Sequence, residues 1–295
     1  MDISYIDMHM HTNYSDGELS PKEIINLADI EQTKILSITD HDSIAGLEEF
    51  KSSIADDMIG IKGVEFSSYI IVNNKRYKIH ILGYAFDEKN GKLNKLLTEL
   101  KLKRYEKHIE LLTDLKKRIK AIPEKYINDL DFYRYCWFNR DVVDCFKKAG
   151  YDEDTILDLK NYYKQNRFSY GNDYNEEAKR VIDSIKEAGG YVIFAHPYAY
   201  GFDEETLANI TLKLMELGID GIEVFQSDCS DKDSIKLLNF VNENNLLFSV
   251  GSDFHRLNSS DGRMIGHGIN NNLCVEETSL SNTIIDNKQY FKSKK

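Results

Sequence analysis

The segment DMHMHTNYSDG, residues 7–17, alternates polar and apolar side chains at its start. Because successive side chains of a β-strand point to opposite faces, Asp7, His9 and His11 share one face and two methionines lie on the other. Burying imidazole and carboxylate groups is costly unless each finds a partner. Histidine and aspartate are common metal ligands, so the pattern predicts a shared metal site.

The N-terminal part of the chain alternates between short apolar segments and amphipathic segments. SPKEIINLADI, residues 20–30, begins with a capping box made by Ser20 and Glu23, which is typical of a helix start. Two apolar runs at 59–72 and 76–86 are predicted strands joined by the turn NNK. Helices that follow strands in this way favour a mainly parallel sheet or an α/β barrel.

A central region, residues 91–175, has a different pattern, because leucines repeat at helical spacing and no convincing strand is found. We interpret it as an inserted helical domain that forms part of the substrate pocket. The α/β domain would then consist of residues 1–90 and 176–295. Three further strands are predicted in the second of these parts, at 191–197, 218–225 and 246–255.

Six of the eight histidines lie at or near the ends of predicted strands, together with several acidic residues. In α/β folds the carboxyl ends of the strands gather at the active site. Each residue alone has an ordinary explanation, such as a hydrogen-bonded core histidine or a paired core carboxylate. A metal cluster would satisfy all these buried polar groups together, and we therefore prefer it. The candidates are His9, His11, Asp40, His41, Glu65, His80, His196, Glu223, Asp253 and His255.

The composition excludes several classes of protein. A net charge of −11 argues against a protein that tracks long duplex nucleic acid, which usually has a basic surface. No apolar run approaches the ~20 residues of a membrane helix and the start lacks a signal-peptide pattern, so we expect a cytoplasmic protein without a membrane partner. The four scattered cysteines are typical of reduced thiols. The motifs of a nucleophile elbow, a P-loop and a dinucleotide site are missing.

The motifs DMHMHTNYSDGELSP, ITDHDSIAGL, GVEFSS, IHILGY, AHP and GSDFH follow one another along the chain. In this order they resemble the successive motifs of the PHP (polymerase and histidinol phosphatase) family. The resemblance implies a distorted (β/α)7 barrel with two or three divalent metal ions. SDGELSP, TDHDSIAGL and IHILGY look most like one branch, which contains nucleoside 3′,5′-bisphosphate phosphatases and enzymes that trim short RNA from its 5′ end. That branch also carries an inserted helical domain.

The resemblance also implies a set of ligands. One metal would be held by His9, His11, Glu65 and Asp253. A second would be held by Asp16, His41 and His255, and a third by His80 and His196 with Glu65 bridging to it. Asp7 and Asp40 would each orient a liganding imidazole through its other ring nitrogen, and Glu223 would be a structural carboxylate or act in the same way. Imidazole and carboxylate ligands suit Mn²⁺, which we expect first, or Fe²⁺ or Zn²⁺.

These features predict a metal-dependent phosphoesterase. A hydroxide bridging the first two metals would hydrolyse a phosphate ester of a small nucleotide, such as a 3′,5′-nucleoside bisphosphate, or of a 5′-phosphorylated short oligoribonucleotide. Arg140 in the insertion would clamp a second phosphate, with Arg134, Arg167, Arg256 and Arg263 as alternatives. Two other interpretations stay open: a histidinol-phosphate-type phosphomonoesterase on the same barrel, and a non-catalytic metal-binding module.

Overall fold

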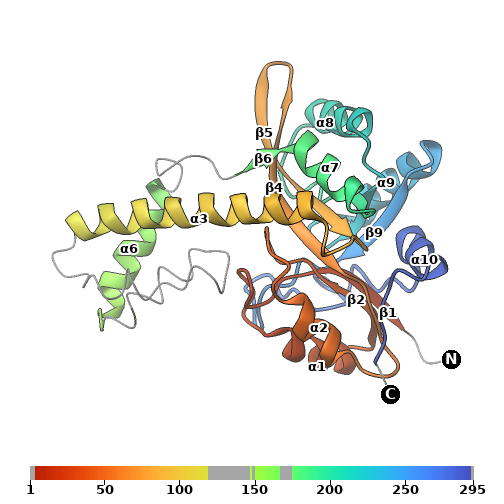
Figure 1. The fold of residues 1–295 in the computed structure, drawn as a ribbon, viewed down its shortest axis with the longest axis horizontal. Helices are drawn as coiled ribbons and strands as arrows, with labels where there is room; N and C mark the ends of the chain where they lie inside the picture. The colour runs from red at the N-terminus through yellow and green to blue at the C-terminus, as the bar shows by residue number, and fades with distance from the viewer. Residues whose placement is uncertain (1–3, 119–146, 148–149, 167–174, 294–295) are drawn as a thin grey trace.

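The fold contains two β-sheets with helices packed around them (Figure 1). The computed structural model describes residues 4–118, 147, 150–166 and 175–293. The smaller sheet has three parallel strands, β1 (Tyr5–Met10), β2 (Thr33–Ile38) and β3 (Ile59–Gly60), in that order.

The larger sheet is mixed and has the strand order β6-β4-β5-β7-β8-β9. Its strands are β4 (Gly63–Val72), β5 (Lys75–Tyr84), β6 (Glu176–Glu177), β7 (Tyr191–Phe194), β8 (Gly221–Gln226) and β9 (Leu247–Gly251). β4 and β5 form an antiparallel hairpin, and β7, β8 and β9 are parallel to one another. The hairpin turn predicted at NNK consists of Asn73 and Asn74, both with positive φ, as a tight two-residue turn requires.

The two sheets touch at both of their facing edges. Met10 of β1 forms an isolated bridge with Phe254, and His41 forms one with Glu65 of β4. These bridges bring the carboxyl ends of β1, β2 and β9 next to the start of β4. The predicted α/β class is confirmed. A closed barrel is not shown, because isolated bridges and not continuous ladders connect the sheets.

In the described part of the chain, six helices pack around the sheets. They are α1 (Pro21–Ile30), α2 (Leu47–Ser53), α7 (Ala178–Glu187), α8 (Glu204–Leu217), α9 (Asp231–Glu243) and α10 (Ser279–Asp286). The capping box of Ser20 and Glu23 at the start of α1 is confirmed. The main core cluster joins both sheets to helices on their outer faces, and a second cluster joins both sheets to α10, which the sequence analysis did not identify.

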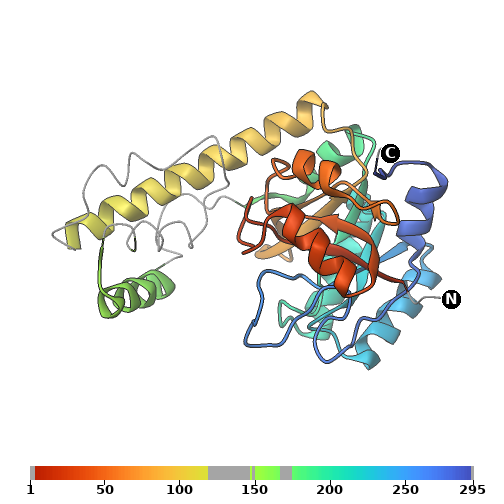
Figure 2. The same cartoon turned by 90° about the horizontal axis from the view of Figure 1, so that it is seen from below.

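Two further helices, α3 (Gly91–Arg118) and α6 (Glu153–Asn166), lie in the region interpreted as an insertion. α3 begins on the body of the molecule and projects away from it, and α6 lies near its far end (Figures 1 and 2). The leucines Leu93, Leu96, Leu97 and Leu100 are buried in the main core, so the predicted helical spacing is confirmed at the root of α3. Within the described ranges, every helix is too short or too polar to span a lipid bilayer.

Candidate metal centre

The alternation along β1 brings two histidines into the interior at the end of the strand. His9 and His11 are fully buried, and their Nε2 atoms lie 3.2 Å apart. Two imidazole nitrogens at this distance share at most one proton between them. The free lone pairs therefore point into the same small space.

Two carboxylates close this space. Asp253 Oδ1 lies 3.1 Å from His11 Nε2 and 3.4 Å from His9 Nε2, and Glu65 reaches the same two nitrogens at 3.3 and 3.4 Å. One ligand atom from each of these four residues lies within 4.8 Å of the others. This is the group that the family resemblance implied for the first metal.

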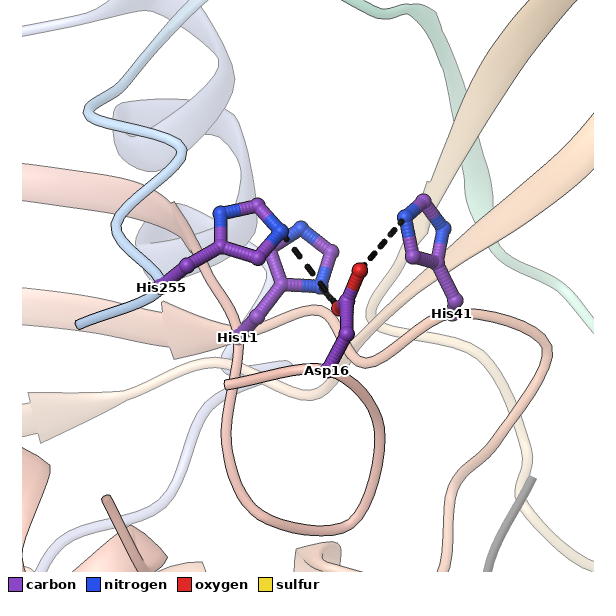
Figure 3. A group of neighbouring side chains, drawn as sticks. All are labelled: His11, Asp16, His41 and His255. Carbon is purple, nitrogen blue, oxygen red and sulfur yellow. Dashed lines mark ion pairs between the residues drawn. The ribbon is translucent and has the colours of Figure 1, made fainter. Parts of the chain in front are cut away.

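A second group surrounds Asp16, which follows β1 in the loop SDG (Figure 3). Asp16 lies 3.4 Å from His255 Nε2, 3.5 Å from His11 Nδ1 and 3.9 Å from His41 Nε2. The rings of His11 and His255 stack with their centroids 4.2 Å apart. The structure thus places the three residues expected for a second metal together and adds His11 to them.

Glu65 stands between these groups and a third. Its Oε1 atom lies 2.9 Å from both His80 Nδ1 and His196 Nε2, and its Oε2 atom lies 3.0 Å from His41 Nδ1. The ligand atoms of His41, Glu65 and His80 form a compact group, and His196 reaches it through Glu65. The expected third set lacked His41, which the structure places beside it.

The electrostatics of this cluster favour added positive charge. Burial by itself raises the pKa of Glu65, but the imidazoles of His80, His41 and His9 lower it well below its usual value. Burial lowers the pKa of His11, while Asp253, Glu65 and Asp16 raise it to about 10. The carboxylates are therefore ionised. In the absence of a metal ion, protons on some of the histidines supply the positive charge that balances them.

The donor set fits divalent metal ions. Imidazole nitrogens and carboxylate oxygens converge, thiolates are absent from the groups, and the buried Nδ1 of His196 has no hydrogen-bond partner among the described residues. A divalent cation would satisfy carboxylates and neutral imidazoles together, whereas protons satisfy only some of them.

Three acidic residues lie behind the cluster, and one expectation about them is wrong. Glu223, fully buried, accepts a hydrogen bond from His9 Nδ1 at 3.0 Å and one from the backbone N–H of His196 at 2.8 Å. Among the described residues, Asp7 contacts no imidazole. Its carboxylate accepts hydrogen bonds from the backbone N–H groups of His9, Ser252 and Gly266, and these three bonds occupy both of its oxygens.

Asp40 also contacts backbone and hydroxyl groups. It accepts from the N–H and Oγ1 of Thr12 at 2.8 and 2.7 Å and from Ser15 Oγ at 2.5 Å. Ser15 Oγ in turn lies 3.4 Å from His11 Nδ1. The expected contact of Asp40 with a liganding ring is thus indirect.

Two arginines near the centre form ion pairs that the sequence did not reveal. Arg263 was considered there as a phosphate ligand, but its guanidinium contacts Asp253 Oδ2 at 3.2 Å and also Asp228 and Asp261. Asp253 therefore faces the metal groups with Oδ1 and Arg263 with Oδ2. Arg104 of α3 is buried and pairs with Asp42 Oδ2 at 2.5 Å, next to His41 in the chain. Arg140, Arg134 and Arg167 lie outside the described residues.

A mixed α/β fold with clustered histidines and carboxylates between its sheets is typical of metal-dependent enzymes. The model of the PHP domain matches residues 7–192, and the chain belongs to this family. The matched range holds the site residues from His9 to His80. His196, Asp253 and His255 follow it.

Curated relatives extend over most of the chain. A 5′-3′ exoribonuclease of Haemophilus influenzae is 30% identical and covers 84% of this chain and 89% of its own length. A 3′,5′-nucleoside bisphosphate phosphatase of Chromobacterium violaceum is 28% identical over 90% of this chain and 92% of its own length. A solved structure described as an amidohydrolase from Chromobacterium violaceum superposes with a TM-score of 0.74 at 22% identity and 98% coverage of both chains, which shows the shared fold.

Proposed function

We propose that the protein is a metal-dependent phosphoesterase that hydrolyses a phosphate ester of a small nucleotide or of a short 5′-phosphorylated oligoribonucleotide. The observation that carries the proposal is the convergence of three neighbouring donor groups, two of which include Glu65, from segments between residues 9 and 255. Family membership and relatives named as a phosphatase and an exoribonuclease support the same class of reaction.

The residues that would hold the metals are His9, His11, Asp16, His41, Glu65, His80, His196, Asp253 and His255. We propose two or three ions, with Mn²⁺ first and Fe²⁺ or Zn²⁺ as alternatives. Bound divalent ions would supply a water of lowered pKa and positive charge for the phosphate oxygens. Three carboxylates cancel only about half of the charge of three dications, so the pocket stays positive in an acidic protein.

The surrounding residues would keep this centre in shape. Glu223 fixes the ring of His9, and thereby turns His9 Nε2 toward His11 and Asp253. Asp40 holds the loop that carries Asp16, through its bonds to Thr12 and Ser15. Both carboxylates act through other residues and contact no substrate in this scheme.

We further propose that the two sheets together form the distorted (β/α)7 barrel of the family, and that residues 91–175 form an inserted domain at the substrate pocket. The edge bridges between the sheets and the outward course of α3 support these two statements (Figures 1 and 2). In the same scheme Arg140 of the insertion binds a second phosphate.

The decisive experiment compares three substrates with metal-reconstituted enzyme. We expect turnover of adenosine 3′,5′-bisphosphate or of a 5′-phosphorylated oligoribonucleotide, and little or none of histidinol phosphate. Glu65→Gln is the matched inactive variant, because it keeps the size of the side chain and removes a charge that two of the three groups share. Cleavage of histidinol phosphate alone would establish the other phosphatase class. Full metal content without turnover of any phosphoester would establish a metal-binding module.

A further inference from the structure

One cysteine and one histidine outside the metal centre lie within hydrogen-bond distance of each other. The Sγ atom of Cys274 lies 3.5 Å from Nδ1 of His267, a normal separation for a bond that involves sulfur. Neither residue belongs to the three donor groups of the metal centre. Cys274 is exposed, whereas Cys229, the other cysteine in the described part of the chain, is buried. A thiol that a reagent can reach therefore lies next to a group that can accept its proton.

The opposite nitrogen of this imidazole is held at the end of helix α1. His267 Nε2 lies 3.2 Å from the backbone oxygen of Glu31 and 3.4 Å from its carboxylate Oε2. Both oxygens are acceptors, so the ring proton of the neutral imidazole lies on Nε2, and Nδ1 keeps a lone pair toward the thiol. Glu31 caps the carboxyl end of α1, which also favours positive charge on the ring. Cysteine, histidine and glutamate thus have the order of a nucleophile, its base and the group that orients the base.

Tyr5 lies beside both members of this pair. Its ring meets the ring of His267 edge to face, with the centroids 4.9 Å apart. Partial burial raises the pKa of the Tyr5 phenol, and so do the charge of the Cys274 sulfur and a hydrogen bond to it. The phenol therefore keeps its proton and can donate a hydrogen bond to a thiolate. The carboxylate of Glu276 raises the same pKa, so negative charge lies near the sulfur and a neutral reagent fits the site better than an anionic one.

The residues that flank the pair are bonded to β1. Gly266, which precedes the histidine, donates its N–H to Asp7 Oδ2 at 2.9 Å. Val275, which follows the cysteine, accepts a hydrogen bond from the N–H of Ile6 at 2.9 Å. Backbone bonds to the same strand on both sides therefore keep the thiol and the imidazole at a fixed separation, as a proton transfer between them requires.

We propose that Cys274 is a nucleophilic thiol that reacts with disulfides of low molecular weight, with His267 as its base. In this step the proton of the thiol passes to His267 Nδ1, and the Cys274 sulfur attacks one sulfur atom of the disulfide. A bond forms between these two sulfur atoms, the original disulfide bond breaks, and the second sulfur leaves as a thiolate that takes the proton from His267. Cys274 is thereby oxidised to a mixed disulfide, and the leaving half of the reagent is reduced to a thiol.

The test measures how fast each cysteine of the protein reacts with 4,4′-dithiodipyridine, a neutral disulfide, by timed quenching and mass spectrometry of the peptides. Near pH 7 we expect His267→Gln to slow the reaction of Cys274 by about 10- to 30-fold, because an unassisted thiol is ionised only to a few per cent there. The glutamine amide can still donate to the carbonyl of Glu31. Glu276→Gln is the matched control, since it removes a charge near the sulfur, and it should change the rate by less than about threefold.

The same comparison at about pH 10 separates a base from a residue that only shapes the site. Exposed thiols ionise there without help, so wild type and His267→Gln should react at rates within about threefold of each other. The proposal is overturned if Cys274 of the wild type is unreactive, if His267→Gln or Glu276→Gln contradicts the rates expected near pH 7, or if the slow reaction of His267→Gln persists at pH 10. None of these measurements depends on turnover of a phosphoester, so failure of the proposed function leaves the result intact.

Discussion

Replacing Glu223 by glutamine tests whether the buried carboxylate behind His9 controls metal binding. Glu223 accepts two hydrogen bonds, from His9 Nδ1 at 3.0 Å and from the N–H of His196 at 2.8 Å. An amide has one oxygen, so Glu223→Gln loses the charge-assisted bond or turns its NH₂ group toward a buried donor. A lost bond to a charged group or a buried unsatisfied donor costs about 2 kcal/mol, which corresponds to about 30-fold weaker metal binding.

The assay is competition for Mn²⁺ with a chromogenic chelator at neutral pH, together with thermal unfolding of the metal-free protein. Ser249→Ala is the control, because Ser249 pairs with Glu223 in the sheet, is fully buried, and has a hydroxyl without a hydrogen-bond partner among the described residues. We expect Ser249→Ala to bind Mn²⁺ as wild type does. Unchanged affinity in Glu223→Gln, or an equal loss in Ser249→Ala, would refute the positioning role of Glu223.

Three further predictions concern the same centre. Gly251→Ala should weaken Mn²⁺ binding by more than about tenfold, because a Cβ at this position would lie 2.1 Å from His9 Cβ and 2.4 Å from Glu223 Oε1. Gly91→Ala is the control: a Cβ at Gly91 would meet open space, so competition with the chelator should be unchanged. Arg104→Met should lower the free energy of unfolding in urea by about 3 kcal/mol, since it removes the cation beside the buried Asp42 carboxylate; a loss below about 1 kcal/mol would contradict this. The carboxylates raise the pKa of His11 to about 10, so Mn²⁺ must displace protons when it binds. The affinity for Mn²⁺ should therefore increase with pH above neutrality, and the heat of binding measured by calorimetry should differ between Pipes and Tris buffers. A heat of binding that does not depend on the buffer would exclude proton release.

The ligand residues could be predicted because their chemistry is local in the sequence. A histidine or aspartate directly after an apolar strand, as in the motifs that contain His41 and Asp253, has few structural explanations, and several such motifs in order point to one centre. The strands that carry them were also predictable, since apolar runs with turn residues between them mark strands such as β4 and β5.

The supporting contacts could not be predicted, because they join residues far apart in the chain and of ordinary type. Arg104 lies in a lysine-rich helix and gives no sign in the sequence that it is buried against Asp42. Asp7 has the position of a residue that orients a histidine, yet Glu223, 214 residues from His9, has that contact. The sequence analysis did not predict two separate sheets for a similar reason. The choice of which strands pair at the edge of a sheet leaves no periodic pattern in the sequence.

The hairpin of β4 and β5 has a consequence for how the centre assembles. Glu65 and His80 are only 15 residues apart, whereas His9 and Glu223 are 214 residues apart. The entropy of closing the longer loop is greater by about 2 kcal/mol, so the pair on the hairpin can meet before the chain has brought in its two ends. One part of the histidine and carboxylate cluster is thus encoded in a single contiguous stretch, and the remainder forms only when β9 reaches β1.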